Sequence, residues 1–446
     1  MLADYKNCRL IKKLKRTIRV IVGIILGVYI GMILLLNLPF VQRQMSVWVS
    51  AKLSSVLGSE LSIGQVYMGL LNRIIINDLY VKDLAGEDLL KVARLSAKFD
   101  LLPLLEGRIS ISNIQLFGFT IQLNKKTPED APNFQFIIDA FTPKEEKTTS
   151  TDLDLRINSL LIRRGTLSYD VLSERKTPGK FNANHIKLDN IIAGISLKAI
   201  RNDSINAAIK RLSVDEANSG FELKKLSLQM IGNDQQMRIK DFEIALPHTS
   251  IQTDTIRLQY DSIGALRHFT DGVNFSFRMK PSRITLQDLS AFVPAFGSFR
   301  ETLQTEITAS GSLNNLKCSK LSLSSPGRHF YMQGDASLQD LSQPDNAYVF
   351  ANLSRWQADR EGVSFLLRNF GNNTSRALQN LGNISFRGEL SGYFTDLVTY
   401  GQIRTDLGEI HTDVKISSNK QEGDLAYSGQ VQTQDFDLGS MLTTPN

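Results

Sequence analysis

An alternating apolar pattern that skips one position in its middle constrains the fold more than any other feature of this sequence. In "RISISNIQLFGFTIQL" (108–123), Ile109 and Ile111 alternate with polar residues, two polar residues follow, and Ile114 and Leu116 resume the alternation. Strict alternation is typical of a β-strand with one buried face. Four apolar residues at offsets 0, 2, 5 and 7 form no single stripe on a helix, so the pattern favours strands.

The same pattern recurs along the chain, with weakly apolar residues in some copies. An extra residue turns every later side chain to the opposite face of a sheet, unless a β-bulge absorbs it or a tight turn begins a new strand. The sequence therefore predicts a long, twisted, repetitive β structure whose apolar residues share one face. Further copies occupy 61–68, 90–97, 181–188, 221–228, 251–258 and 316–323. The candidate lining residues of the shared face are Ile74, Ile76, Leu79 and Val81; Ile109, Ile111, Ile114 and Leu116; Leu155, Ile157, Leu160 and Ile162; and Met237, Ile239, Phe242 and Ile244.

A basic segment precedes an uncharged apolar segment at the amino terminus. The seventeen residues 20–36 carry no charge, and 37–40 extend them with little polarity. That length makes roughly 26–31 Å of helix, enough to cross the hydrocarbon core of a bilayer. Basic residues stay cytoplasmic, so we predict a single-pass membrane anchor with a cytoplasmic amino terminus and the long body on the far side of the membrane. A cleaved signal peptide is the alternative, but "NLPFVQRQM" offers no small-x-small cleavage site. The residues expected to orient the chain in the membrane are Lys12, Lys13, Lys15, Arg16, Arg19 and Trp48.

The charge distribution argues against nucleic-acid binding, and the motifs argue against catalysis. Seven basic residues and one acidic residue in 1–19 account for the whole formal net charge of +6, so the rest of the chain is neutral. A nucleic-acid-binding protein is expected to carry positive patches on its folded body. The five histidines are scattered without metal-ligand spacing, and no phosphate-binding glycine loop occurs. We predict no enzyme activity, cofactor or metal, with His185 a surface residue of a strand and Cys318 a small core residue.

The chain divides by pattern into six segments. Residues 1–19 form the cytoplasmic segment and 20–40 the anchor. Residues 41–58 form an amphipathic helix that either lies on the outer leaflet or, as we favour, caps the end of the sheet. A first β region (59–141), a polar linker (142–152) and continuing β repeats (153–446) follow. Short helices are expected at 100–107, at 133–141 with Asn133 as a possible N-cap, at 286–297 and at 375–381.

A sheet with one apolar face must cover that face. Each exposed leucine-sized side chain forfeits roughly 1.5–3 kcal/mol relative to burial. Three arrangements bury the same residues: a closed sandwich with a dry core, a solenoid, or a curled sheet whose trough holds something apolar, such as the acyl chains of lipids. The pattern alone does not choose among them.

Several stretches of the chain resemble a known family. They are "INDLYVKDLAGEDLLKV" (76–92), "FDLLPLLEGRISISNIQLFGFTIQL" (99–123), "GTLSYD" (165–170), "LQDLSAFVPAF" (286–296) and "YSGQVQTQDFDLGSML" (427–442). With the membrane anchor, they resemble the amino-terminal part of the AsmA-like translocation and assembly module subunit TamB family, in its Bacteroidetes-like form. The resemblance implies an inner-membrane anchor and a taco-shaped periplasmic β groove that serves outer-membrane biogenesis by moving phospholipids between membranes.

The resemblance also implies an alternative role and a missing part. The alternative is assistance to the insertion of outer-membrane β-barrels with a TamA-like partner. Members of the family are usually longer, with a partner-binding domain expected after residue 442, so we expect this chain to be truncated. An alternative of another class is an anchored structural or adhesive β-solenoid with a dry core.

Overall fold

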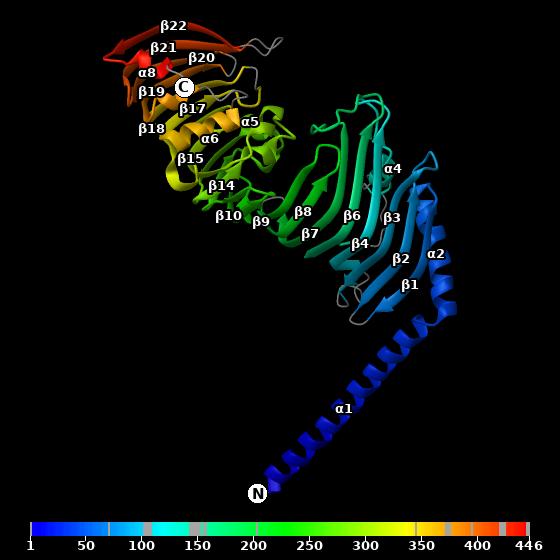
Figure 1. The fold of residues 1–446 in the computed structure, drawn as a ribbon. Coiled ribbons are helices and arrows are strands. Elements are labelled where there is room, and N and C mark those ends of the chain that lie inside the picture. Colours follow the sequence, from blue (N-terminus) through cyan, green and yellow to red (C-terminus); the bar gives the residue numbers. More distant parts are fainter. Residues whose placement is uncertain are drawn as a thin grey trace. The chain divides into compact units, whose positions relative to one another are not determined.

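The computed structural model describes residues 2–69, 72–100, 109–141, 153–154, 158–201, 204–343, 346–370, 376–393, 396–418 and 425–442 (Figure 1). It confirms the predicted mostly-β fold with a long apolar helix at the amino terminus and a few short helices. The chain forms two compact units. Unit 1 comprises Met1–Arg175 and Asn184–Asn190, and unit 2 comprises Lys176–Ala183 and Ile191–Asn446.

Unit 1 begins with two long helices. Helix α1 (Leu2–Leu36) contains Lys15–Leu36, a segment long and apolar enough to span a membrane. Helix α2 (Pro39–Leu57) starts with a proline in its first turn and ends at Gly58, whose left-handed φ of 66° lets its N–H donate to Ser54 O.

A third helix, α4 (Gln135–Phe141), lies close to the predicted position. The side chain of Asn133 does not cap it. Instead, Asn133 Oδ1 accepts the N–H of Asn124, and Asn133 Nδ2 donates to Asp83 Oδ2. The predicted linker 142–152 lies outside the described residues, as does nearly all of the predicted helix 100–107.

The strands of unit 1 are β1 (Leu61–Gly69), β2 (Arg73–Lys82), β3 (Asp88–Phe99), β4 (Ile109–Lys125), β5 (Leu153–Asp154) and β6 (Ser159–Val171), with the first part of β7 (His185–Arg201). Strands β1 to β4 pair antiparallel in sequence order. Strand β4 then pairs parallel with β5 and with β6.

The skipped positions of unit 1 lie side by side across five strands. Apolar residues next to the step form an aligned row: Val66, Ile76, Leu95, Leu116 and Ile162. The next row is Ile63, Leu79, Val92, Phe119 and Gly165. Two residues of each strand separate these rows where strict alternation has one. Because every strand makes the step at the same level, the apolar positions stay aligned on one side, which we name the apolar face.

The backbone makes this step through residues in the left-handed region. Asp78 has a φ of 53°, Gly118 of 62° and Arg164 of 57°, and each is the second of the two residues between the rows. Their neighbours on the intervening strands are small: a Cβ on Gly64 would lie 3.0 Å from Asp78 Cβ, and one on Gly118 would lie 3.2 Å from Ala93 Cβ. The step is therefore a kink that combines a positive φ with small neighbours. It coincides with the predicted skip in β1, β2 and β3, whereas in β4 and β6 it lies beyond the predicted skip, at 117–118 and 163–164.

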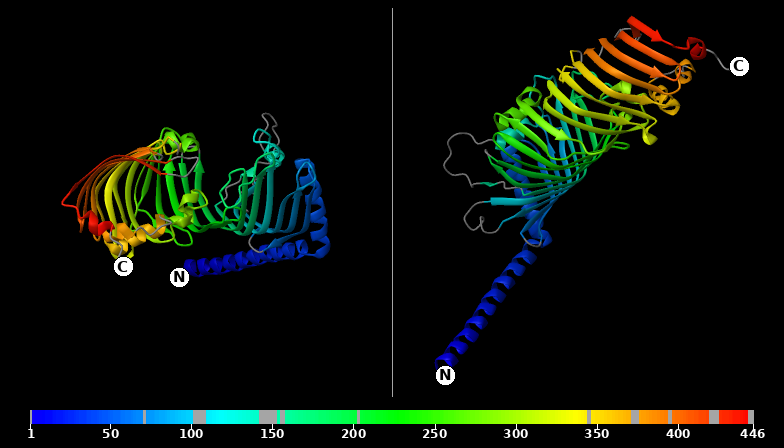
Figure 2. Two further views of the ribbon diagram at one scale, coloured as in Figure 1. Left: turned by 45° about the horizontal axis from the view of Figure 1, so that its top comes forward. Right: turned by 90° about the vertical axis from the view of Figure 1, so that its left-hand side faces the viewer.

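Unit 2 continues with strands β8 to β22. Their bounds are β8 (Ser204–Glu216), β9 (Phe221–Asn233), β10 (Gln236–Ala245), β11 (Ser250–Gln252), β12 (Ile256–Tyr260), β13 (Val273–Arg278), β14 (Ser282–Thr285), β15 (Thr302–Ser312), β16 (Asn315–Ser324), β17 (Phe330–Gln339), β18 (Tyr348–Ala358), β19 (Ile384–Tyr393), β20 (Asp396–Thr405), β21 (Gly408–Ser418) and β22 (Leu425–Gln434). All pairings found between them are antiparallel, and Figure 2 shows the strong curvature of the strands within each unit.

Short helices interrupt these strands. They are η1 (Ile263–His268), α5 (Phe269–Gly272), η2 (Leu286–Leu289), η3 (Pro294–Ser298), η4 (Pro326–Arg328), α6 (Arg360–Phe370), α7 (Arg376–Asn380) and α8 (Leu438–Leu442). The predicted helix 286–297 is the pair η2 and η3, and the predicted helix 375–381 is α7. Helices η1 and α6 are absent from the sequence prediction.

Unit 2 resolves the skip in both of the ways that the sequence allows. The register between β16 and β17 shifts between Cys318 and Leu321. Strand β18 shifts its register near Leu353 relative to both of its neighbours, β17 and β19. Bulges therefore absorb the extra residue at these two places. In the copy at 251–258 the strand is broken instead: β11 and β12 pair with successive parts of the same strand, β10. In β10 itself, Asp241 takes a φ of 51° at the register shift.

We predict that the left-handed residue of a kink tolerates glycine and resists a β-branched side chain. Arg164→Val should lower the free energy of unfolding by about 1–2 kcal/mol, because a branched Cβ crowds the backbone at positive φ. Arg164→Gly should leave it unchanged or raise it slightly. Urea denaturation of the purified variants measures both.

The matched control is Arg163→Val, which places the same side chain on the preceding residue, where the backbone is not left-handed. Its expected effect is within about 0.5 kcal/mol of zero. Equal destabilisation by the two valine variants would contradict the role assigned to the φ of Arg164.

Candidate apolar binding face

Helices cover part of the apolar face in unit 1. Residues Met45, Val49 and Leu53 of α2 pack against a cluster in which Val66 is 3% and Val81 5% exposed. Helix α4 contributes Phe136, Ile137 and Ala140 to the same cluster. Helix α2 thus lies on the sheet as a cap, and its Trp48 side chain, 69% exposed, lies outside this core.

The remaining candidate residues of unit 1 are less deeply buried. Ile74 is 40% exposed. It lies near one end of β2, and Val81 lies near the other end. The half-buried candidates are Ile76, Leu79, Ile111, Ile114, Leu116, Leu160 and Ile162. Leu155 and Ile157 lie outside the described residues, and so do the side chains of Ile109, Lys12 and Lys13. On α1, Lys15, Arg16 and Arg19 are exposed.

Unit 2 has two apolar clusters covered by helical segments. In the first, Ala265 and Leu266 of η1 pack against Met237, which is 5% exposed, and its neighbours, including the candidate Ile239. In the second, Val363 and Phe365 of α6 pack against Phe330 and Ala358 at the ends of β17 and β18. The candidates Phe242 and Ile244 of β10 are half-buried.

A third cluster in unit 2 consists entirely of strand residues. Its buried members are Ala309, Cys318, Ala336, Val349 and Ala351, between 2% and 8% exposed. Side chains on the inner side of a curved sheet converge, so small residues become buried by their own neighbours. The burial of Cys318 agrees with its predicted place in the core. Larger side chains of the strands, among them Phe277, Leu338 and Leu390, pack around these small residues.

Glycines mark where β19 and β20 bend. A Cβ on Gly388 would lie 2.6 Å from Cζ of Phe386 and 2.3 Å from Tyr400 O. A Cβ on Gly401, its register partner, would lie 2.7 Å from the Phe386 ring. The phenylalanine ring therefore lies over two glycines, which lets the paired strands approach and curve.

The apolar face becomes more open toward β22. Ile403, Ile410 and Val414 are half-buried, whereas Tyr427 is 65% and Val431 58% exposed. The registers place Tyr427 opposite Ile416 and Val431 opposite Thr412. Side chains on the apolar face of unit 2 are thus buried in the strand-only cluster, whereas large apolar side chains of β22 are exposed to solvent.

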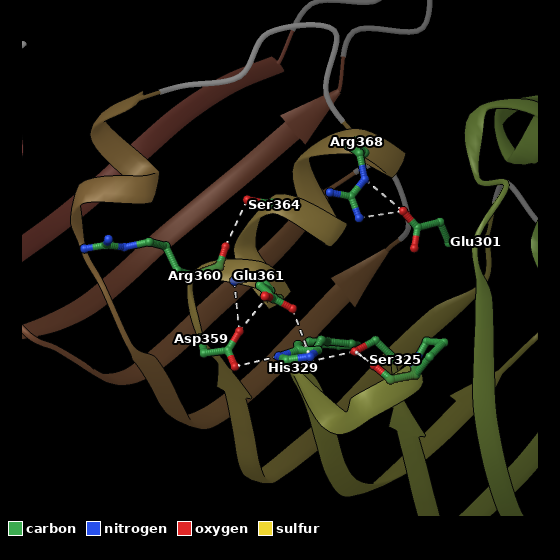
Figure 3. Close-up of polar contacts among 11 residues, drawn as sticks. Glu301, Ser325, His329, Asp359, Arg360, Glu361, Ser364 and Arg368 are labelled. Carbon is green, nitrogen blue, oxygen red and sulfur yellow. Dashed lines mark hydrogen bonds and ion pairs between the residues drawn. The ribbon is translucent and has the colours of Figure 1, made fainter.

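Polar contacts fix α6 at one end of the strands (Figure 3). Asp359 Oδ1 accepts the N–H groups of Glu361 and Gly362, both at 2.9 Å, and so caps the helix. Asp359 Oδ2 lies 2.8 Å from His329 Nδ1, and His329 Nε2 lies 3.0 Å from Glu361 Oε2. At the other end, Arg368 pairs with Glu301 at 2.7 Å. These contacts hold Val363 and Phe365 over the apolar face.

The ion pair between His329 and Asp359 shifts both pKa values. The hydrogen bond that His329 donates to the Asp359 carboxylate, and the charge of that carboxylate, raise the pKa of His329 above its ordinary 6.5. Although burial acts to raise it, the pKa of Asp359 is lowered, because the N–H of Gly362 and the His329 ring stabilise the carboxylate. Protonated His329 is therefore a partner in the anchoring of α6.

His185 is not the surface residue that the sequence predicted. It is 3% exposed in unit 1, with Nδ1 2.7 Å from Asp170 Oδ1 and Nε2 2.9 Å from Glu174 O. The alternating pattern identified its strand, but not the chain between β6 and β7 that folds over it. Both ring nitrogens have hydrogen-bond partners, so His185 serves as a structural residue.

Sequence reasoning also missed α6. Its signal was Asp359 as an N-cap followed by Val363, Leu366 and Leu367 at helical spacing.

No group of three or more histidine, cysteine, aspartate or glutamate side chains that could hold a metal ion occurs among the described residues. No protein-family model, curated protein or solved structure matches the chain. The resemblance to the AsmA-like TamB family therefore stays a prediction.

We predict that the anchoring of α6 weakens as the pH rises. A raised pKa in the folded state means that the contribution of His329 is fully present below about pH 6.5 and is lost as the pH rises through the raised value. After correction for intrinsic exchange rates, the amides of α6 should be better protected from hydrogen exchange at about pH 5.5 than at about pH 8.5.

Asp359→Asn is the control, because asparagine still caps a helix but carries no charge to hold the proton on His329. The pH dependence of α6 protection should shrink in this variant. If it persists unchanged, the His329–Asp359 pair is not its source.

Proposed function

We propose that this protein is an inner-membrane-anchored, periplasmic carrier of phospholipid acyl chains that acts in outer-membrane biogenesis. The observation that carries the proposal is the aligned apolar face, which in unit 2 runs from a cluster of strand residues alone to the exposed Tyr427 and Val431. The membrane-spanning length of Lys15–Leu36 and the family resemblance support the location and the biological role. In this proposal the basic end of α1 is cytoplasmic.

The chemistry of the face favours acyl chains over other ligands. Most of its described residues are aliphatic or aromatic, with threonine at some positions such as Thr412, and they offer no repeated polar group that would recognise a sugar, a peptide backbone or a charged metabolite. An acyl chain gains about 0.8 kcal/mol for each methylene group removed from water, whatever its position along the face. A ligand held in this way can shift along the strands without breaking directional bonds, which is what a carrier requires.

An anchored structural protein with a dry core is the second candidate, and a specific observation favours it. Helices α2, α4 and α6 already cover parts of the apolar face, where Val66, Phe330 and Phe365 are 3–5% exposed. The assembly of outer-membrane barrels with a TamA-like partner remains an expectation from the resemblance. The two candidates differ in whether lipid reaches the half-buried residues of the face, including residues beside a helical cover such as Ile239.

Site-specific photo-crosslinking in cells tests the proposal. A benzophenone amino acid at Leu116, Ile239 or Val414 would lie on the apolar face. The same amino acid at the adjacent Gln115, Arg238 or Lys415 would lie on the opposite, polar face of the same strand. We expect phospholipid adducts at the first three positions, detected by mass spectrometry of the purified protein, and at least about a tenfold lower yield at the second three.

The pairs of neighbouring positions make the test specific to a face. Equal labelling within each pair would indicate contact with bulk membrane and contradict a groove. A lack of lipid adducts at Leu116, Ile239 and Val414, with normal folding, would favour the dry core.

A further inference from the structure

The polar face of unit 2 carries a basic hollow formed by three neighbouring strands. Arg355 of β18, Arg387 of β19 and Arg404 of β20 line a depression of about 320 Å³. Its other polar side chains are serines and glutamines, and no carboxylate lines it. The hollow lies across β18, β19 and β20, which are neighbours in the sheet (Figure 1).

The bulge in β18 creates this concentration of charge. Leu353 pairs with Gly388 and Trp356 with Phe386, so Ser354 and Arg355 together stand opposite the single residue Arg387. On the next strand, Ser385 pairs with Arg404. A bulge places two consecutive side chains on one side of the strand. Arg387 and Arg404 lie on the polar face by regular alternation, and the bulge places Arg355 on that face as well.

Protein acceptors hold the three guanidinium groups at their Nε atoms. Arg355 donates to Gln357 Oε1 at 3.0 and 2.8 Å, and its Cζ lies 5.4 Å from the centre of the Tyr331 ring. Arg387 Nε donates to Ser354 O at 3.2 Å. Arg404 Nε lies 2.9 Å from Glu409 Oε1. The contact of Arg355 also uses its Nη2, which leaves Nη1 of Arg355 and the Nη donors of Arg387 and Arg404 to a ligand.

The positive charge of the hollow is only partly neutralised. Glu409 pairs with Arg404, but neither Arg355 nor Arg387 forms an ion pair with a carboxylate in the part of the chain that the structure describes. Three planar donor groups around one depression suit a tetrahedral oxyanion, whose oxygens accept several N–H groups at once. The positions of two of the guanidinium groups are fixed by neutral partners, which lowers the entropy lost on binding.

We propose that this hollow is a binding site for a phosphate group, held by Arg355, Arg387 and Arg404. The phosphate could come from the diester headgroup of a phospholipid or from a free phosphate or phosphomonoester, and the two sources share this chemistry. Binding at the hollow is independent of whether the apolar face holds acyl chains, because the three arginines lie on the opposite side of the strands.

Isothermal titration calorimetry on the full chain tests the site. The protein is kept in a maltoside detergent, which contains no phosphate, and is titrated with inorganic phosphate and separately with glycerophosphoglycerol, the deacylated headgroup of phosphatidylglycerol. We expect saturable binding of at least one probe, weakened by added salt. The double variant Arg355→Gln/Arg387→Gln should lose about tenfold or more in affinity, because it removes two of the three charged donor groups from the hollow.

Two further variants keep the test interpretable. Arg257→Gln removes one charge from an exposed position of β12 on the polar face and should bind like the wild type. Arg387→Gln alone leaves the Arg355–Tyr331 contact in place, and should weaken binding even if the double variant is too unstable to purify.

Every outcome bears on the proposal. Binding of glycerophosphoglycerol alone identifies a lipid headgroup site, binding of inorganic phosphate alone identifies a site for free phosphate or monoesters, and binding of both supports the shared chemistry. A wild type that binds neither probe, or arginine variants that bind as tightly as the wild type, would overturn it. The photo-crosslinking at Leu116, Ile239 and Val414 reports separately on acyl chains, so either proposal can fail alone.

Discussion

A strand keeps its apolar side chains on one face only if every extra residue is taken up locally, and the rest of this structure depends on that condition. In unit 1 the five strands take the step at the same level, with Asp78, Gly118 and Arg164 in the left-handed region. If one strand made the step elsewhere, its later side chains would turn to the polar face, and the aligned rows would be lost. The register of these five strands and the alignment of the apolar face of unit 1 therefore have one cause.

The apolar residues of unit 2 are buried in different ways in different parts of the curved sheet. Where β15 to β18 curve, alanines such as Ala309 and Ala336 are buried without any helix in their cluster. Where the strands end, larger residues such as Phe330 need α6 as a cover, and the His329–Asp359 pair fixes that helix. A cover held by polar contacts at its ends leaves the middle of the face unobstructed. The arrangement combines a stable core at the strand ends with an apolar surface between them.

The sequence predicted the strands well because alternation is a local property that two or three neighbouring residues display. It also located α2, α4 and the short helices at 286–297 and near 376–380. It did not predict α6, although that segment carries an N-cap and helical apolar spacing, or η1, which packs on the strands directly before and after it. The predicted exposure of His185 was wrong because its burial depends on contacts with Asp170 and Glu174, which alternation within one strand does not show. The hollow between Arg355, Arg387 and Arg404 required the registers of three strands, which no single stretch of sequence contains.

The kinks and bulges also determine what the polar face can do. Each skipped pair adds a second outward side chain at one level of a strand, and many of these pairs are basic, such as Arg163–Arg164, Lys210–Arg211 and Lys224–Lys225. Two of the lysines find carboxylate partners, Lys224 in Glu222 and Lys225 in Glu243. At Arg355 the bulge instead faces another arginine, Arg387, without a carboxylate in the hollow. Like charges placed side by side on a rigid sheet repel one another, and an anion bound between them relieves that repulsion. The step that keeps one face apolar thus sets the charge pattern of the other.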